Sequence, residues 1–225
     1  MTIAIIKDEY MENIIIQIAI PSKGKLAGPA LEFLKRKDIS PIPAHERTYQ
    51  LDTKIPWAKL LRRNSMDIPE DVARERRVIV GITGLDCVME CGIPLQALRL
   101  DDSAPVSMSV IVPSGREPDF SKGISVATKF PNIAGKFFRE NGIRVQRIRK
   151  LNGAVESSLF GEYDAIVDIV ETKVTIEAND QKEIMKVMDV YPVLVLPQIP
   201  KLDALIDTNP EIGQIMADLL RGLSG

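Results

Sequence analysis

The chain has 225 residues with nearly balanced charge, 29 Lys and Arg against 31 Asp and Glu, and 45% of its residues are hydrophobic. This length is sufficient for one large domain or two small ones with a substantial core. The formal net charge of −2 argues against a general nucleic-acid binder, which usually carries a strong basic excess. The hydrophobic content and the lack of low-complexity tracts exclude an intrinsically disordered chain.

Histidine and cysteine are scarce in this sequence. His45 is the only histidine, and Cys87 and Cys91 are the only cysteines. A Ser-His-Asp triad or a Cys-His pair would have to use His45, and no recognisable nucleophile motif accompanies it. The spacing of the two cysteines is not that of a zinc ribbon, so we expect two buried thiols. The chemistry is therefore expected to rely on carboxylates, backbone amides, hydroxyls and cations.

No segment approaches the roughly 20 consecutive apolar residues that a membrane-spanning helix needs. The N-terminus has only a few apolar residues before Lys7 and no small-residue cleavage site, so it is not predicted to be a signal peptide. Translation can start at a second methionine, Met11, which leaves open whether residues 1–10 are native. We expect a cytoplasmic protein.

The first half of the chain alternates β-branched runs with helical spacing. Residues 14–20 have the apolar pattern of a buried strand, and residues 26–37 repeat apolar side chains at helical intervals. Residues 40–66 are rich in proline and are predicted to be irregular or partly β. A second buried strand is predicted at residues 78–84, and a short helix follows it at 85–91.

The second half continues this alternation. Strands are predicted at residues 97–102, 107–113, 124–128, 143–151, 163–170 and 193–197. Helices are predicted at residues 132–141 and 155–160, from the ETKVT segment at 171–175 onward, and after Asn209. Alternation this regular is typical of an α/β fold with mostly parallel sheets.

Two interruptions of the alternation predict a two-lobed chain. The polar stretch at 101–106 and the return of the chain near 185–192 separate the two lobes. Lobe I is expected to hold residues 1–104 and 188–225, and lobe II is expected to be the inserted residues 105–187. Two α/β lobes place the carboxyl ends of their strands around a shared cleft, where ligands usually bind.

The strongest local signal is DIVETKVTIEAND, residues 168–180. A buried strand ends there, a loop with two threonines follows, and a helix begins. This order directs backbone N–H groups and the hydroxyls of Thr172 and Thr175 to one point, which predicts a phosphate site. Asp168 and Glu171 flank it and suit ribose hydroxyls or a magnesium ion. The simpler alternative is that both threonines are only helix N-cap residues.

Two other turns carry charged side chains. Lys23 and Lys25 surround Gly24 at a strand-to-helix turn, which suits a polyphosphate but equally fits a solvated turn. Glu156 begins a short helix after an Asn-Gly turn, either as a capping residue or as a polar ligand contact.

The segment VGITGLD ends a predicted strand with two glycines and a carboxylate, Gly81, Gly84 and Asp86. Glycine at the end of a strand often marks a close approach of the backbone to a ligand, although tight packing also requires it. Both interpretations remain open from the sequence.

The order of these segments resembles the ATP phosphoribosyltransferase family, which catalyses the first step of histidine biosynthesis. The resemblance rests on IAIPSKGKL, on DIP followed by GITGLD, on ATKFPN, and on LNGAVES followed by GEYDAIVDIVETKVTIEAN. These segments cover most of the chain from about residue 17 to residue 180. The chain resembles the short form of the family, which lacks a third, regulatory domain and works with a separate regulatory subunit.

This resemblance implies a two-lobed fold like that of the type II periplasmic binding proteins. It implies displacement at ribose C1 of phosphoribosyl pyrophosphate (PRPP) by N1 of ATP, with release of pyrophosphate. Such a transfer needs two aligned anionic substrates and a leaving group neutralised by magnesium and cations. The implied cofactor is Mg²⁺. The implied partners are ATP, PRPP, further copies of the chain and a regulatory subunit, with neither nucleic acid nor membrane.

The resemblance also implies roles for individual residues. The PRPP site is expected at Asp168, Glu171, Thr172, Lys173, Val174 and Thr175. Within this set, the segment 172–175 is expected to hold the 5′-phosphate and the two carboxylates to face the ribose. The nucleotide or pyrophosphate site is expected at Lys23, Gly24, Lys25, Asp86 and Glu156. No catalytic or metal-ligating residue is assigned.

Several positions depart from the family's pattern. Lys173 stands where the family has glycine in the phosphate loop, and lysine adopts positive φ less easily. Lys25 replaces an arginine and loses its bidentate geometry, and Asp180 replaces a common glycine. Ile79 and Asn64 stand about where the family has aspartate and arginine. These changes support a second hypothesis, a catalytically impaired paralogue acting as a ligand-binding or regulatory protein. Another bilobed enzyme or a solute binder is a third.

Overall fold

The computed structural model describes residues 15–74, 78–100, 104–151, 162–170, 172–198, 203–204, 206–207 and 210–223. The chain divides into two compact units. Unit 1 comprises Met1–Asp102 and Pro192–Gly225, and unit 2 comprises Ser103–Tyr191. The lobe boundaries expected from the sequence, after residues 104 and 187, lie a few residues from these divisions.

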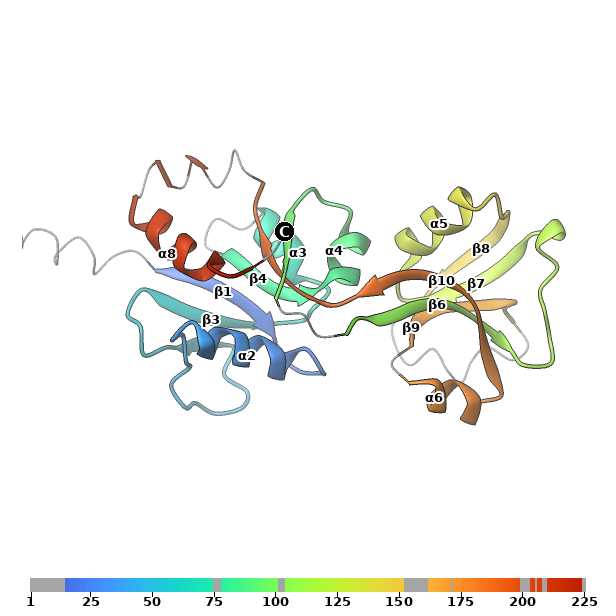
Figure 1. Ribbon diagram of the computed structural model, residues 1–225, viewed down its shortest axis with the longest axis horizontal. Coiled ribbons are helices and arrows are strands. Elements are labelled where there is room, and N and C mark those ends of the chain that lie inside the picture. The colour runs from blue at the N-terminus through green and yellow to red at the C-terminus, as the bar shows by residue number, and fades with distance from the viewer. Residues whose placement is uncertain are drawn as a thin grey trace, which may run out of the picture. The chain divides into compact units, whose positions relative to one another are not determined.

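Unit 1 is built on a sheet with the strand order β2-β3-β1-β4-β11-β5; Figure 1 labels its strands β3, β1 and β4. Its strands are β1 (Ile16–Pro21), β2 (Gln50–Asp52), β3 (Ala58–Arg63), β4 (Val78–Gly84), β5 (Gln96–Arg99) and β11 (Pro192–Leu196). β1 pairs in parallel with β3 and β4. The other neighbours in this sheet pair antiparallel. The carboxyl ends of β3, β1 and β4 therefore lie at one edge of the sheet.

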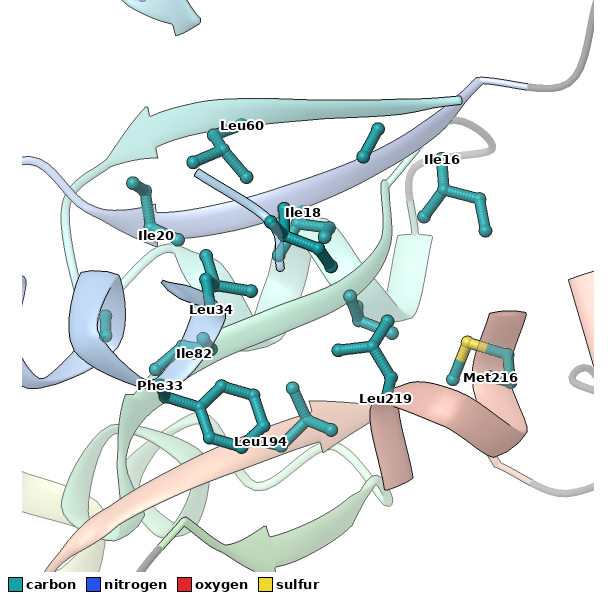
Figure 2. Packing of buried hydrophobic residues seen from close by; sticks show 14 of the residues in the cluster. Ile16, Ile18, Ile20, Phe33, Leu34, Leu60, Ile82, Leu194, Met216 and Leu219 are labelled. Atoms are coloured by element: carbon teal, nitrogen blue, oxygen red, sulfur yellow. The ribbon is translucent and has the colours of Figure 1, made fainter. Parts of the chain in front are cut away.

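The helices of unit 1 are α2 (Ala27–Arg36), α3 (Ile68–Arg74), α4 (Leu85–Cys91) and α8 (Pro210–Leu220). Its main hydrophobic cluster joins the sheet to α2 and α8. Figure 2 shows apolar side chains of the core, which include Ile16, Ile18, Ile20, Phe33, Leu34, Leu60, Ile82, Leu194, Met216 and Leu219. β1 lies between two parallel neighbours and is buried along most of its length, which explains its almost continuous apolar run.

Unit 2 is built on a second sheet with the strand order β10-β6-β9-β7-β8. Its strands are β6 (Val106–Pro113), β7 (Ile124–Thr128), β8 (Val145–Lys150), β9 (Ala165–Val170) and β10 (Gln181–Val190). Its helices are α5 (Pro131–Glu140), α6 (Lys173–Ala178) and the short 3₁₀ helix η1 (Phe120–Lys122). β7 pairs in parallel with β8 and β9, whereas β6 pairs antiparallel with β9 and β10.

Asp164, just before β9, ties that strand to β7. Its Oδ2 accepts hydrogen bonds from the Ser125 N–H at 2.9 Å and from the Ser125 Oγ at 2.8 Å. Its Oδ1 accepts one from Arg116 Nη2 at 3.0 Å. Burial by itself raises the pKa of the Asp164 carboxyl, but the Ser125 hydrogen bonds and the Arg116 charge outweigh it, so this pKa lies below its ordinary value.

The structure confirms the α/β architecture and most of the predicted elements. Parallel pairs join the strands that lead into the candidate site in both units, and antiparallel strands extend each sheet. The sequence analysis missed β10, whose mixture of charged and apolar residues has no clear strand period. The helix predicted at 155–160 lies outside the described residues.

Among the residues that the structure describes, no helix has both the length and the apolar character needed to cross a membrane.

Candidate functional site

Three parallel strands of unit 2 end at one edge of its sheet. Thr128, the last residue of β7, is fully buried, and its Oγ1 donates a hydrogen bond to the Val167 carbonyl of β9 at 2.6 Å. The same oxygen accepts one from the Phe130 N–H at 2.9 Å. After β8, the Leu151 N–H donates to the Thr128 carbonyl at 2.8 Å. These bonds tie the end of β7 to β9 and to the start of the loop after β8, at the edge where open α/β sheets usually bind ligands.

The predicted strand-loop-helix is present at this edge. Asp168 lies half-buried on β9, and its Oδ1 accepts a hydrogen bond from the Ile169 N–H at 2.9 Å. Thr172 is exposed and occupies the N-cap of α6 with an extended backbone, at φ −141° and ψ 142°. The first turn of a helix has N–H groups without intrahelical acceptors, and these groups suit an anion. Val174 follows with 72% of its surface exposed.

The backbone conformation of this loop shows whether lysine fits at position 173. Among the described residues, the non-glycine residues with positive φ are Asp38 and Asp180. Lys173 is the first residue of α6 and has an ordinary helical backbone. Lysine at this position is therefore not strained. Asp180 follows α6 at φ 56°, which gives a physical reason for glycine at that position in the family.

Two serines of β6 lie beside Asp168, and the sequence analysis missed them. The antiparallel register places Ser109 directly opposite Asp168 and Ser107 opposite Val170. Directly opposed residues lie on the same face of a sheet. Ser109 is fully buried, and its Oγ lies 3.0 Å from the Oγ of Ser107. The sequence signal was the pair of hydroxyls at alternate positions of an otherwise apolar strand.

The parallel strands of unit 1 also bring their following loops together. The Ser22 N–H, after β1, donates to the Arg63 carbonyl at the end of β3 at 2.8 Å. Thr83 of β4 is fully buried, and its Oγ1 donates to the Ser65 carbonyl at 2.9 Å. These two bonds connect the start of the loop after β1 to the end of β3, and the end of β4 to the loop after β3; the predicted turn at 23–25 and the VGITGLD segment lie here.

The turn after β1 carries the two predicted lysines. Lys23, Gly24 and Lys25 are all exposed. Gly24 has φ +84°, a backbone conformation that favours glycine. The turn therefore presents two ammonium groups on either side of a backbone that a larger residue would strain.

The two glycines of the VGITGLD segment have different structural roles. A Cβ on Gly81 would overlap Cγ2 of Ile68 and lie 3.0 Å from Cγ2 of Val72, both on α3. Close packing of α3 on β4 therefore explains this glycine. A Cβ on Gly84 would instead overlap the Oδ1 of Asp86, the second residue of α4. Asp86 is only 5% exposed.

Cys87 lies beside Asp86 and is also buried. Its Sγ donates a hydrogen bond to the Asp86 Oδ2 at 3.8 Å. Burial, and next the charge of Asp86, raise the pKa of the Cys87 thiol to about 12. Cys91 is half-buried rather than buried as expected, and both cysteines are free thiols.

Part of the predicted site lies outside the described residues. This applies to Glu156, to Glu171 and to the side chains of Lys173 and Thr175. Within the described part of the chain, no group of three or more His, Cys, Asp or Glu side chains is placed to hold a metal ion.

Fold and site together define an α/β protein of two sheets, whose charged and hydroxyl groups gather in the loops after parallel strands. A family model described as ATP phosphoribosyltransferase matches residues 64–220. An ATP phosphoribosyltransferase of Petrotoga mobilis is 39% identical over 191 residues, covering 82% of this chain and 86% of the relative. The chain belongs to the ATP phosphoribosyltransferase family.

Other relatives are longer than this chain. An ATP phosphoribosyltransferase of Metallosphaera sedula is 34% identical over 189 residues, which cover 80% of this chain but only 64% of the relative. A solved structure titled as the ATP phosphoribosyl transferase (HisG:HisZ) complex from Thermotoga maritima matches with a TM-score of 0.75 and 22% identity, covering 91% of this chain and 96% of that one. This likeness confirms the expected type II periplasmic-binding-protein-like fold.

Proposed function

We propose that this chain transfers the phosphoribosyl group of PRPP to N1 of ATP, the first step of histidine biosynthesis. The family match over residues 64–220 carries the proposal, because it includes both the Asp86 segment and the loop at 168–175. In this reaction the lone pair of N1 forms a bond to ribose C1. The bond from C1 to the pyrophosphate oxygen breaks, and pyrophosphate leaves with that electron pair. The products are phosphoribosyl-ATP and pyrophosphate.

In this proposal, PRPP binds at the loop between β9 and α6. The N–H groups of the first turn of α6, with the hydroxyls of Thr172 and Thr175, bind the 5′-phosphate. Lys173 adds a positive charge close to the same phosphate. Asp168 and Glu171 accept hydrogen bonds from the ribose hydroxyls and so orient C1 for attack. Val174 completes the loop through its backbone.

The residues proposed to bind the nucleotide or the pyrophosphate are Lys23, Gly24, Lys25, Asp86 and Glu156. Lys23 and Lys25 neutralise the charge that develops on the leaving pyrophosphate, and Gly24 lets the backbone between them approach it closely. Asp86 and Glu156 accept hydrogen bonds from the nucleotide. Lys25 acts as a point charge, which is sufficient for charge neutralisation although it lacks the fork of an arginine.

The donor set fits magnesium that is carried mainly by substrate. Mg²⁺ is usually held by one or two carboxylates together with substrate phosphates, rather than by a cage of protein side chains. Asp168 and Glu171 are carboxylates of this kind, and the described residues contain no larger ligand cluster. When bound, magnesium supplies charge neutralisation to the pyrophosphate.

The proposal extends to partners and location. The Thermotoga maritima structure is titled as a complex of two proteins, which supports a separate regulatory subunit for this chain, in addition to self-association. Both substrates are metabolites of the cytoplasm, and the reaction places the protein there. The rival hypothesis of an impaired paralogue loses one of its supports, because Lys173 is accommodated without positive φ.

The first test is a calorimetric titration of the purified chain with magnesium-PRPP, and with ATP in a parallel run. Binding is measured before turnover, because a chain that works with a separate subunit can be silent in an activity assay. Micromolar binding of PRPP is expected, and Thr172→Ala is expected to weaken it about tenfold, or by about 1.4 kcal/mol. Ser121→Ala removes an exposed hydroxyl in η1, before the amino end of β7 and so at the opposite edge of the same sheet, and it is the control that leaves binding unchanged.

Turnover is then measured as pyrophosphate release that requires both ATP and PRPP. Formation of phosphoribosyl-ATP would establish the transferase. A folded wild-type chain that binds neither PRPP nor ATP would contradict the proposal.

A further inference from the structure

Gly84 has a backbone that any residue can adopt, so its conformation does not explain why it is glycine. Its φ is −85° and its ψ is 149°, in the extended region. The explanation is the side chain two residues later. A Cβ on Gly84 would overlap Asp86 Oδ1 and lie 3.2 Å from Asp86 Cγ. The carboxylate of Asp86 is therefore folded back over the Cα of Gly84, in space that only glycine leaves open.

The other oxygen of this carboxylate is in contact with Cys87. The Cys87 Sγ lies 3.8 Å from Asp86 Oδ2 and donates its hydrogen to it. Cys87 is 3% exposed. Its thiol has a pKa of about 12, so it stays protonated at neutral pH and remains a donor. Because the thiol stays neutral, it orients the neighbouring carboxylate as a weak donor and adds no second negative charge.

These contacts limit the freedom of the Asp86 side chain from two sides. We infer that Gly84 and Cys87 are positioning residues that fix the Asp86 carboxylate in the orientation in which it accepts a hydrogen bond from the nucleotide. The inference rests on the proposed function, in which Asp86 contacts ATP. It explains the second glycine of the GITG segment and gives a role to a thiol that the sequence analysis expected only to be buried.

The test of Gly84 is a double-mutant cycle with ATP as the titrant. Gly84→Ala is expected to weaken ATP binding about tenfold, because the new Cβ displaces the carboxylate. In the Asp86→Ala background, the same substitution is expected to change ATP affinity less than twofold, since the oxygen that it displaces is gone. A purely structural role for Gly84 would give the same loss in both backgrounds.

The affinity for PRPP provides a second readout. A purely structural role would lower the affinities for ATP and PRPP together. The proposed ligands of the PRPP 5′-phosphate and ribose lie in unit 2, and those proposed for its pyrophosphate are Lys23 and Lys25 rather than Asp86. Gly84→Ala and Asp86→Ala are therefore expected to leave PRPP affinity within about twofold. In kinetic terms, KM for ATP rises while KM for PRPP does not. Equal losses for both substrates would overturn the inference.

Cys87 is tested with a conservative rescue and a control on the same helix. Cys87→Ala removes the donor and is expected to weaken ATP binding about threefold to fivefold. Cys87→Ser restores a hydroxyl donor at the same position and recovers most of this loss. Cys91→Ala, one helical turn further along α4, leaves ATP affinity unchanged. If Cys87→Ser is as weak as Cys87→Ala, the hydrogen-bonding role of Cys87 is wrong.

These experiments distinguish failure of this inference from failure of the proposed function. If wild-type protein binds ATP and PRPP but Asp86→Ala binds ATP normally, the inference is overturned and the transferase proposal stands. If wild-type protein binds neither ligand, the transferase proposal and the nucleotide role of Asp86 both fall. In that case the double-mutant cycle is repeated with the free energy of unfolding in urea as the readout. If the loss of stability caused by Gly84→Ala persists in the Asp86→Ala background, the positioning contact between Gly84 and the Asp86 carboxylate is wrong.

Discussion

Replacing Gly81 by alanine is expected to force α3 away from β4. The new Cβ would come well within 3.0 Å of Cγ2 of Ile68 and to 3.0 Å from Cγ2 of Val72. Both side chains are fully buried, and both are β-branched, so neither methyl group can rotate away cheaply. Overpacking of a core typically costs about 1–3 kcal/mol. Because two stiff side chains meet the same atom, we expect a loss of about 2–3 kcal/mol.

Urea unfolding followed by tryptophan fluorescence measures this loss directly. The chain has one tryptophan, Trp57, which packs against the core of unit 1, the unit that contains Gly81. With a urea m-value of about 2 kcal/mol/M, the midpoint should fall by about 1 M or slightly more. The Ile68→Ala background removes the overlapping methyl group, and there the penalty of Gly81→Ala is expected to shrink.

Gly28→Ala is the matched control for this prediction. Gly28 lies in α2 directly before Pro29, and a Cβ added to it meets no atom within 4 Å apart from its chain neighbours and the backbone of the helix. The same substitution there should change the free energy of unfolding by no more than about 1 kcal/mol, since the better helix propensity of alanine is opposed by crowding of its Cβ against the following proline. If Gly81→Ala unfolds at the wild-type midpoint, the packing explanation of this glycine is refuted.

Three further outcomes follow from single contacts. Asp180→Gly should raise the free energy of unfolding by about 0.5–1 kcal/mol in urea titrations, because Asp180 has φ 56°, and a decrease would contradict this. Asp164 has a lowered pKa, so its stabilising contribution is complete above its unfolded pKa of about 3.9 and is lost as pH falls through the folded value. Asp164→Asn should thus be less stable than wild type at pH 7, with the difference shrinking as pH falls below about 4; a constant difference would refute this. With iodoacetamide at pH 8, Cys91 should be alkylated and Cys87 should remain intact in mass spectra, because the pKa of Cys87 is about 12. Equal labelling of the two would show that Cys87 is not protected.

The sequence predicted where the candidate segments lie along the chain because each follows a short apolar run. Strand and helix periods are local properties of the sequence. They mark the ends of the elements on either side of the turn at Lys23–Lys25 and of the loop at 168–175. The α6 start at Lys173 and the strand end at Gly84 agree with those predictions. The roles of these residues in binding stay predictions.

Other features required the tertiary structure. Strand β10 alternates charged and apolar residues irregularly, and its register with β6 shifts at two points, so no sequence period marks it as a strand. Ser109 gains significance only because the register of β6 against β9 places it opposite Asp168. A pairing between strands this far apart in the chain has no local signature.

The sequence by itself determined the α/β class, most of the strands and helices in their order along the chain, and the chain segments that end at the sheet edges. These depend on hydrophobic periodicity and turn residues, which act over a few neighbouring residues. Only the tertiary structure showed why positions 81 and 84 are glycine and how a residue that departs from the family's pattern is accommodated. Gly81 makes room for α3 and Gly84 for the Asp86 carboxylate, while Lys173 lies in ordinary helix. Such differences depend on which atoms of distant segments occupy the adjacent space, and the sequence does not contain that information locally.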